Sequence, residues 1–134
     1  MKIRMPKFSL ALLTATILLA SLSLADDSWK QHVSEADRER TNPVGGQADA
    51  IAAGGRLFED HCAKCHGADA LGRRNKPNLR TDEVQNAADG EIFWLLRNGS
   101  LRRGMPSWSA LPEPSRWQII AYVKSLGKKE QETK

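Results

Sequence analysis

The spacing of the only two cysteines constrains this chain of 134 residues more than any other feature. Cys62 and Cys65 are separated by two residues, and His66 follows directly. A C-x-x-C-H sequence is typical of covalent c-type haem attachment. The two thiols can add to the two vinyl groups of the haem, and the histidine is then held under the iron as the proximal ligand. The motif therefore predicts one covalently attached haem c.

Three other uses of this cysteine pair are weaker predictions. A thioredoxin-like redox pair is expected beside a βαβ pattern, whereas helical patterns surround this motif. A structural zinc site usually has four protein ligands, and outside the motif the chain offers only His32 and His61 as further histidines. A structural disulfide across so short a loop would add little stability. Haem attachment is thus the favoured interpretation.

The first 25 residues have the pattern of a secretory signal peptide. Lys2, Arg4 and Lys7 precede an apolar run over residues 8–22, and Ala25 ends a cleavage-site sequence. The alternative is an uncleaved membrane anchor, but about 20 apolar residues are needed to span a bilayer and this run falls a little short. We therefore expect cleavage after Ala25 and a periplasmic protein without stable membrane insertion.

The net charge of the whole chain is +4, and the expected cleavage changes what this charge implies. Without residues 1–25, 109 residues remain, with 17 Lys and Arg against 16 Asp and Glu, so the net charge falls to +1. Because basic residues are also not interleaved with aromatic ones, we expect no nucleic-acid binding. The length argues for one domain, and we expect a monomer.

Residues 26–47 are polar and charged, and they end in turn-forming residues. Val33 and Val44 are their only aliphatic residues apart from Ala36, so this segment is not expected to build a core. We predict a polar N-terminal extension that holds a helical turn over residues 34–40, with Trp29 as its one packing residue.

Helical spacing of apolar residues begins at Ala48 and predicts an all-α domain, with three to four main helices packed around one haem. No alternation typical of strands competes with these helices. The first helix leads from Ala48 into the cysteine motif, the second is capped at residues 89–91 and stops at 98–99, and the third enters through 112–115 and stops at 127–129. The domain is predicted over residues 48–127, followed by a charged tail over 128–134.

The second axial ligand of the predicted haem iron has few candidates. Met1 and Met5 leave with the signal peptide, so Met105 is the only methionine of the mature chain. It lies in the turn sequence G-M-P-S-W, whereas a methionine that fills a core is expected on an apolar helix face. We therefore predict Met105 as the ligand, with His32 as the bis-histidine alternative. His61 adjoins Cys62 and is poorly placed to reach the opposite haem face.

These residues together resemble the small monohaem class I cytochromes c, and among them a bacterial periplasmic group with a G-M-P-S-W methionine loop. The likeness covers residues 48–127. The residues that carry it are Gly54, Phe58, Cys62, Cys65, His66, Pro77, Leu79, Met105, Trp117 and Tyr122.

The resemblance implies a fold in which the first and last helices cross at a near right angle. Gly54 and Phe58 would meet Ile119 and Tyr122 at that crossing, where glycine permits a close backbone approach. The resemblance also implies that the Pro77 carbonyl accepts a hydrogen bond from the His66 ring, which fixes the tautomer of the ligand. Trp94, Trp108 and Trp117 are expected to help enclose the porphyrin. The predicted cofactor-binding residues are Cys62, Cys65, His66, Pro77, Leu79, Met105 and Trp108, and the predicted iron ligands are His66 and Met105.

The predicted function is one-electron transfer in the periplasm between a dehydrogenase and an oxidase or another cytochrome, without catalysis by this chain itself. Two alternatives stay open: a tightly bound cytochrome subunit of a larger complex, with residues 26–47 as a docking arm, and a haem enzyme or sensor with an open distal position. Two interpretations stay open for a group of basic residues: a ring near the haem that attracts an acidic partner, or ordinary solvated surface charges. The members of this group are Arg73, Arg74, Lys76, Arg80, Arg97, Arg102 and Arg103.

Overall fold

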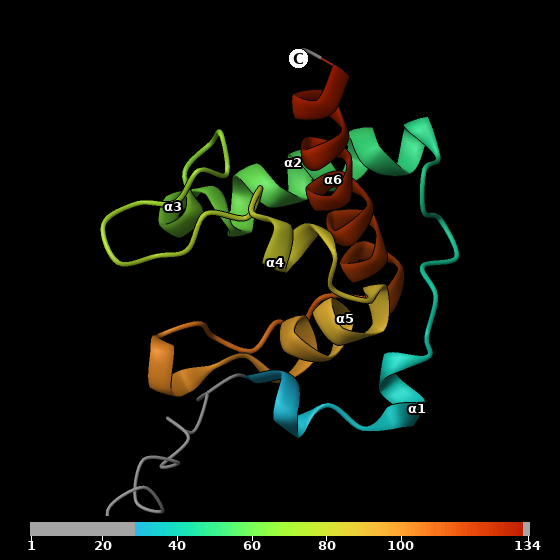
Figure 1. Ribbon diagram of the computed structural model, residues 1–134, viewed down its shortest axis with the longest axis vertical. Coiled ribbons are helices and arrows are strands. Elements are labelled where there is room, and N and C mark those ends of the chain that lie inside the picture. Colours follow the sequence, from blue (N-terminus) through green and yellow to red (C-terminus); the bar gives the residue numbers. More distant parts are fainter. Residues whose placement is uncertain (1–28, 133–134) are drawn as a thin grey trace, which may run out of the picture.

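Six α-helices and two 3-10 helices form the computed structural model, which describes residues 29–132 (Figure 1). No strand is found in this part of the chain, so the all-α prediction is confirmed. No helix in these residues is both long and apolar enough to cross a membrane. The predicted signal peptide, residues 1–25, lies outside the described residues. The helices, in chain order, are η1 Trp29–His32, α1 Glu35–Arg38, α2 Ala48–His61, α3 Ala63–His66, α4 Asp82–Gln85, α5 Asp89–Asn98, η2 Leu101–Arg103 and α6 Glu113–Glu132.

The longest helix, α6, lies across α2 at the centre of the molecule (Figure 1). At the crossing, a Cβ atom added to Gly54 would collide with the backbone carbonyl of Gln118, so only glycine allows the two helices to come this close. The rings of Phe58 and Tyr122 pack beside this contact, with their centroids 5.3 Å apart. The expected meeting of these two helices is therefore confirmed.

The predicted starts and ends of the main helices are correct except at two points. Helix α5 is preceded by Ala88, whose backbone N–H donates to Glu91 Oε2 at 3.0 Å, so Asp89 is the first helical residue and not the cap. Helix α6 does not stop at Gly127 but continues to Glu132. Gly127 packs closely against the side chain of Gln85, so this glycine serves a helix contact rather than a helix end.

The segment of residues 29–47, which we call the strap, lies along α5 and does not extend away from the domain (Figure 1). It contains the predicted helical turn, α1, which Ser34 caps by accepting a hydrogen bond from the Asp37 backbone N–H. Val33 is only 5% exposed, so the prediction that the segment contributes nothing to the core except through Trp29 is wrong. The strap holds to the domain mainly by polar contacts, which apolar spacing does not reveal.

Candidate haem site

A largely apolar cavity lies between α2, α5, α6 and the loops that follow α3 and α5. Five of the seven residues predicted to bind the cofactor line it: Cys62, His66, Pro77, Leu79 and Met105. The other lining residues include Phe58, Ile92, Leu95, Leu96, Ile119, Ile120 and Val123, with Asn78, Thr81, Glu83 and Arg103 as polar members.

A tight helical turn brings the attachment motif to this cavity. Cys62 ends α2, and its carbonyl oxygen accepts hydrogen bonds from the backbone N–H groups of Cys65 (3.0 Å) and His66 (2.9 Å). Both cysteines are free thiols, Cys62 buried and Cys65 exposed. Burial raises the pKa of the Cys62 thiol to about 11, with a smaller contribution from Cys65. The thiol that faces the cavity is therefore protonated at neutral pH.

The ring of His66 is oriented by the loop that follows it. Nδ1 of His66 lies 3.0 Å from the Pro77 carbonyl oxygen, which can only accept a hydrogen bond. Nδ1 therefore carries the proton, and Nε2 keeps the lone pair that can bind a metal. The Gly72 backbone N–H also donates to the His66 carbonyl oxygen at 2.8 Å. The hydrogen bond that the resemblance implied is present in the structure.

Met105 is held at the cavity by a loop that closes on itself. Ser100 and Met105 exchange two backbone hydrogen bonds of 2.9 and 3.0 Å, and Gly99 and Gly104 turn the chain on either side with φ angles of +72° and +73°. The loop is tied to α5, because Ser107 Oγ donates to the Arg97 carbonyl oxygen at 2.6 Å. The thioether is thus placed at the same cavity as His66.

The tryptophans do not lie where they were expected. Trp108 packs on the ring of His61, at 5.3 Å between centroids, and Trp117 stacks on Phe93 at 4.1 Å. Neither these two nor Trp94 is among the residues that line the cavity. Trp29 of the strap lines it instead. Trp29 was predicted to pack against the domain, but nothing in the sequence indicates the surface against which it packs.

The two other histidines do not reach the cavity. His32 stacks on Trp94, with ring centroids 6.5 Å apart, and His61 lies beside Trp108. Neither residue lines the cavity, so the structure favours Met105 over His32 as the partner of His66. A group of three or more His, Cys, Asp or Glu side chains suited to a metal ion is not found among residues 29–132.

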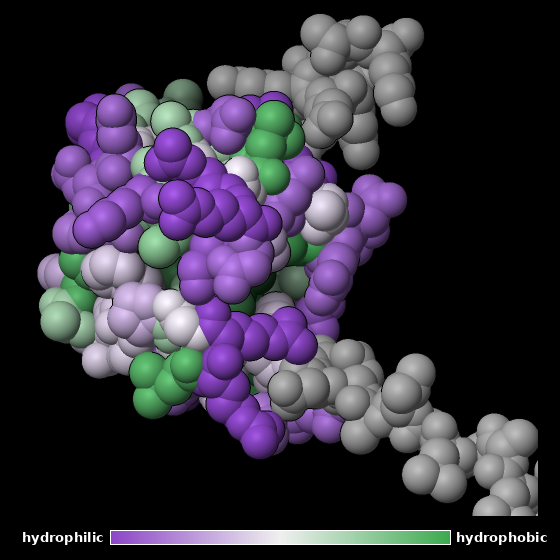
Figure 2. All heavy atoms as spheres, turned by 90° about the vertical axis from the view of Figure 1, so that its left-hand side faces the viewer, coloured by the Kyte–Doolittle hydropathy of each residue, from purple (hydrophilic) through white to green (hydrophobic). Residues whose placement is uncertain are grey.

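Basic side chains gather beside the exposed cysteine, in what we call the basic face: Lys64, Arg73, Arg74 and Lys76. These residues and Cys65 line a shallow hollow. Lys76 also donates to the Arg103 carbonyl oxygen at 3.2 Å, which joins this loop to η2. Both segments lie at the left of Figure 1, and Figure 2 shows that side, where hydrophilic side chains spread between smaller hydrophobic patches.

Not every predicted member of the basic ring belongs to this face. Arg97 lies 3.5 Å from the carboxylate of Asp37 in the strap, and its inclusion in the ring was wrong. Arg80 donates from Nε to the Asp69 carbonyl oxygen at 2.8 Å. Lys64, which lies inside the cysteine motif, was not among the predicted members but lines the hollow.

The residues present fit a haem. Its two apolar faces match the aliphatic and aromatic cavity wall, and a lone pair on nitrogen and a thioether are a known axial pair for haem iron. Two thiols lie on the turn that carries the nitrogen ligand. The fold and this donor set define a c-type cytochrome domain, a protein that transfers electrons.

The particular family follows from comparison with known proteins. The family model described as "Cytochrome C oxidase, cbb3-type, subunit III" matches residues 49–123, and the chain belongs to this family, whose membership implies haem c. Among solved structures, cytochrome CL from the marine methylotroph Methylophaga aminisulfidivorans MPT is similar, with a TM-score of 0.56 and 27% identity. The match covers 69% of this chain and 70% of that one.

Curated relatives are subunits of cbb3-type oxidases. The FixP subunit of Sinorhizobium medicae is 35% identical over 85 residues, which is 60% of this chain and 29% of FixP. The CcoP subunit of Rhodobacter capsulatus is 40% identical over 99 residues, which is 63% of this chain and 33% of CcoP. The chain thus spans about a third or less of the length of these relatives.

Proposed function

We propose that this chain is an exported, periplasmic electron-transfer protein that carries one haem c and works as a cytochrome component of a respiratory oxidase complex. The haem would be attached through Cys62 and Cys65 and ligated by His66 and Met105. The observation that carries the proposal is the single cavity that Cys62, the oriented ring of His66 and Met105 share. Similarity to cbb3-type oxidase subunits supports a place in a complex over a freely diffusing carrier.

The chain's own residues would bind, orient and shield the cofactor, which when bound supplies the one-electron couple of its iron. Pro77 holds Nε2 of His66 ready to bind by occupying Nδ1. The loop around Met105 places a neutral sulfur ligand, and such a ligand favours the reduced state and raises the potential. With His66 and Met105 both bound to it, the iron would offer no position to a substrate, so we propose that the chain is not itself catalytic.

The basic face gives a place for an acidic redox partner to dock. It borders Cys65, one of the two attachment points, so a partner bound there lies close to the haem edge. Exposed leucines flank it, Leu71 on the same loop and Leu101 on η2, the latter 81% exposed. Positive charge with a few apolar contacts suits a small, transient interface, and electrostatic attraction speeds its formation.

The absorption spectrum of protein made with haem-maturation enzymes tests the cofactor and its ligands together. A c-type spectrum with the weak near-infrared band of sulfur bound to ferric iron is expected for the wild type. The Met105→Ala variant should lose this band and gain a spectral shift with carbon monoxide. A carbon monoxide shift in the wild type itself would favour a haem enzyme or sensor.

Membership of a complex is tested by gel filtration of native periplasmic and solubilised membrane extracts, with detection by haem staining. A complex component is expected to elute with oxidase subunits, whereas a free carrier elutes at the size of a monomer. Elution at monomer size in both extracts would overturn the complex and leave the diffusing carrier.

Docking through the basic face is tested by the salt dependence of electron transfer. Arg73→Gln should slow transfer to an acidic partner a few-fold at low ionic strength, because one attractive charge is lost near the contact. Arg56→Gln is the matched control, since Arg56 is an exposed arginine of α2 that does not line the hollow. Equal rates for the two variants would show that the basic residues are ordinary solvated charges.

A further inference from the structure

The strap begins at the haem cavity and lies outside the residues that match the family model. The match covers residues 49–123, whereas Trp29, which is half-buried, lines the cavity from the start of the strap. Its neighbours in the lining include Glu83 and Val84 of α4, and Lys30 Nζ donates to the Glu83 carbonyl oxygen at 3.5 Å. A segment outside the residues that match the family model therefore completes one part of the cavity wall.

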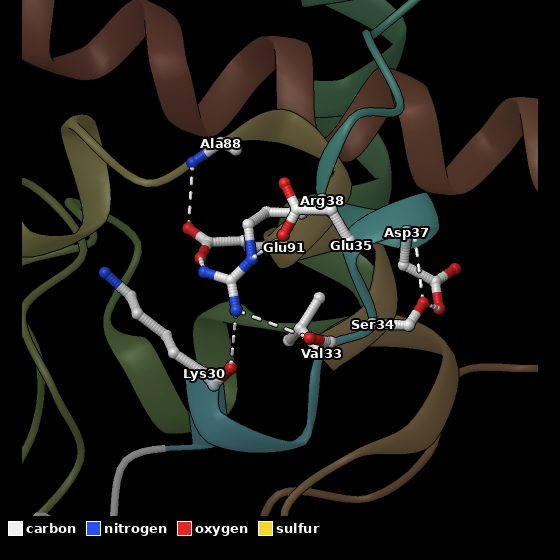
Figure 3. Close-up of polar contacts among 8 residues, drawn as sticks. All are labelled: Lys30, Val33, Ser34, Glu35, Asp37, Arg38, Ala88 and Glu91. Carbon is white, nitrogen blue, oxygen red and sulfur yellow. Dashed lines mark hydrogen bonds and ion pairs between the residues drawn. The ribbon is translucent and has the colours of Figure 1, made fainter.

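An ion pair fastens the start of the strap to α5 (Figure 3). Nη1 of Arg38 donates to Glu91 Oε1 at 2.6 Å, and Nη2 donates to the carbonyl oxygens of Lys30 (3.0 Å) and Val33 (3.3 Å). The side chain of Glu91 is only 7% exposed, and a buried ion pair that loses one partner is strongly destabilised. The guanidinium of Arg38 thus links η1 and the residue after it to α5.

The rest of the strap follows α5 and α6 closely. Gly90 lies against the carbonyl oxygens of Asp37 and Arg40, where a Cβ atom would collide with the strap backbone. The guanidinium of Arg40 lies over the ring of Phe93, 4.2 Å from its centroid. Nδ2 of Asn42 donates to the Trp117 carbonyl oxygen at 2.9 Å. These contacts hold the strap against the domain along its described length.

We propose that the strap closes one edge of the haem cavity. The side chain of Trp29 keeps water out at this edge and so raises the reduction potential. The inference rests on the proposed function, since it requires a haem in the cavity. The ferric state carries one more positive charge than the ferrous state, and water stabilises the higher charge. Solvent exposure is accordingly one of the factors that set the potential of haem proteins.

The test compares midpoint reduction potentials of the purified holoproteins. Trp29→Ala opens the edge and should lower the potential, whereas Trp29→Phe keeps an apolar ring and should stay near the wild type. Thr41→Ala is the matched control, because Thr41 is an exposed strap residue and does not line the cavity. Glu91→Gln weakens the ion pair with Arg38, so it should lower the potential and also speed tryptic cleavage within the strap several-fold.

Two results would overturn the inference. One is a potential of Trp29→Ala equal to that of Thr41→Ala. The other is a strap that trypsin cleaves faster in Glu91→Gln while the potential stays unchanged. These results contradict the strap's role alone, because they are obtained on protein with a c-type spectrum. A wild-type protein without that spectrum would contradict the proposed function and, with it, this inference.

Discussion

At the residue scale, two adjacent glycines of α2 face α6 in different ways, and this predicts opposite tolerance to alanine. A Cβ atom at position 54 collides with the backbone of Gln118, whereas one at position 55 meets the ring of Tyr122 at 3.2 Å, which can shift. Gly54→Ala should lower the free energy of unfolding by roughly 1–3 kcal/mol through overpacking. Gly55→Ala should stay within about 1 kcal/mol of the wild type, because alanine favours a helix. Urea unfolding of both variants measures this, and equal losses would contradict it.

A second residue-scale prediction concerns acid stability. The pKa of Glu113 is below its ordinary value of 4.5, mainly because Trp117 Nε1–H donates to its carboxylate, with Arg40 contributing as well. A lowered folded-state pKa adds stability above the unfolded-state value, and this is lost as the pH falls through the folded-state value. Glu113→Gln should therefore be less stable than the wild type at pH 7, and the difference should vanish as the pH falls below the folded-state pKa of Glu113. The same comparison for exposed Glu59→Gln serves as control, and a Glu113→Gln difference that persists at low pH would contradict the assignment.

At the element scale, the loop between α5 and α6 acts as the support of Met105. Ser107 Oγ ties it to α5 through the Arg97 carbonyl oxygen, and also accepts from the Ser109 backbone N–H at 3.2 Å. Ser107→Ala removes both contacts and should cost about 1 kcal/mol of local stability. The near-infrared sulfur band should then disappear at a lower temperature than in the wild type. Ser109→Ala loses only the contact of its hydroxyl with Ser107 Oγ (3.0 Å) and leaves the bond to Arg97, so it should behave as the wild type. An identical fall in both variants would argue against the tie.

The helices also show which features of the fold a sequence can predict. The start of α2 and the end of α5 follow from apolar spacing and local turn residues, since these signals lie within a few positions of each other. The end of α6 does not, because Gly127 contacts Gln85, a residue 42 positions away. The packing of the strap on α5 could not be predicted for the same reason, since Arg38 and Glu91 are 53 positions apart and both are polar.

At the scale of the whole molecule, the site was more predictable than its surroundings. The motif of Cys62, Cys65 and His66 and the methionine at position 105 use residue types that are rare in this chain. The cavity wall depends on which side chains the fold brings together, and it includes Trp29 but not Trp108. The residue types along the sequence therefore indicate which side chains could bind the iron. Which side chains enclose them is decided only by tertiary packing.

The last prediction is that this domain depends on its haem for folding. Trp29, Leu79, Val84, Leu95 and Met105 are half-buried side chains that line the cavity, so without a haem each leaves apolar surface without a partner. Burying the exposed half of each side chain contributes roughly 1 kcal/mol. Without the haem, the lost free energy is therefore comparable with the lower end of the about 5–15 kcal/mol by which a typical domain is stable. The Cys62→Ala, Cys65→Ala double variant should accordingly yield little folded holoprotein.

Far-ultraviolet circular dichroism and haem staining of equal culture volumes measure this outcome. Thr41→Ala, produced in parallel, controls for expression and export. The double variant is expected to show weak helical signal and little bound haem, because attachment no longer holds the cofactor in the cavity. Normal amounts of helical, haem-loaded protein from the double variant would mean that axial ligation and packing suffice. Normal helicity without haem would mean that the crossing of α2 and α6 forms a stable core by itself.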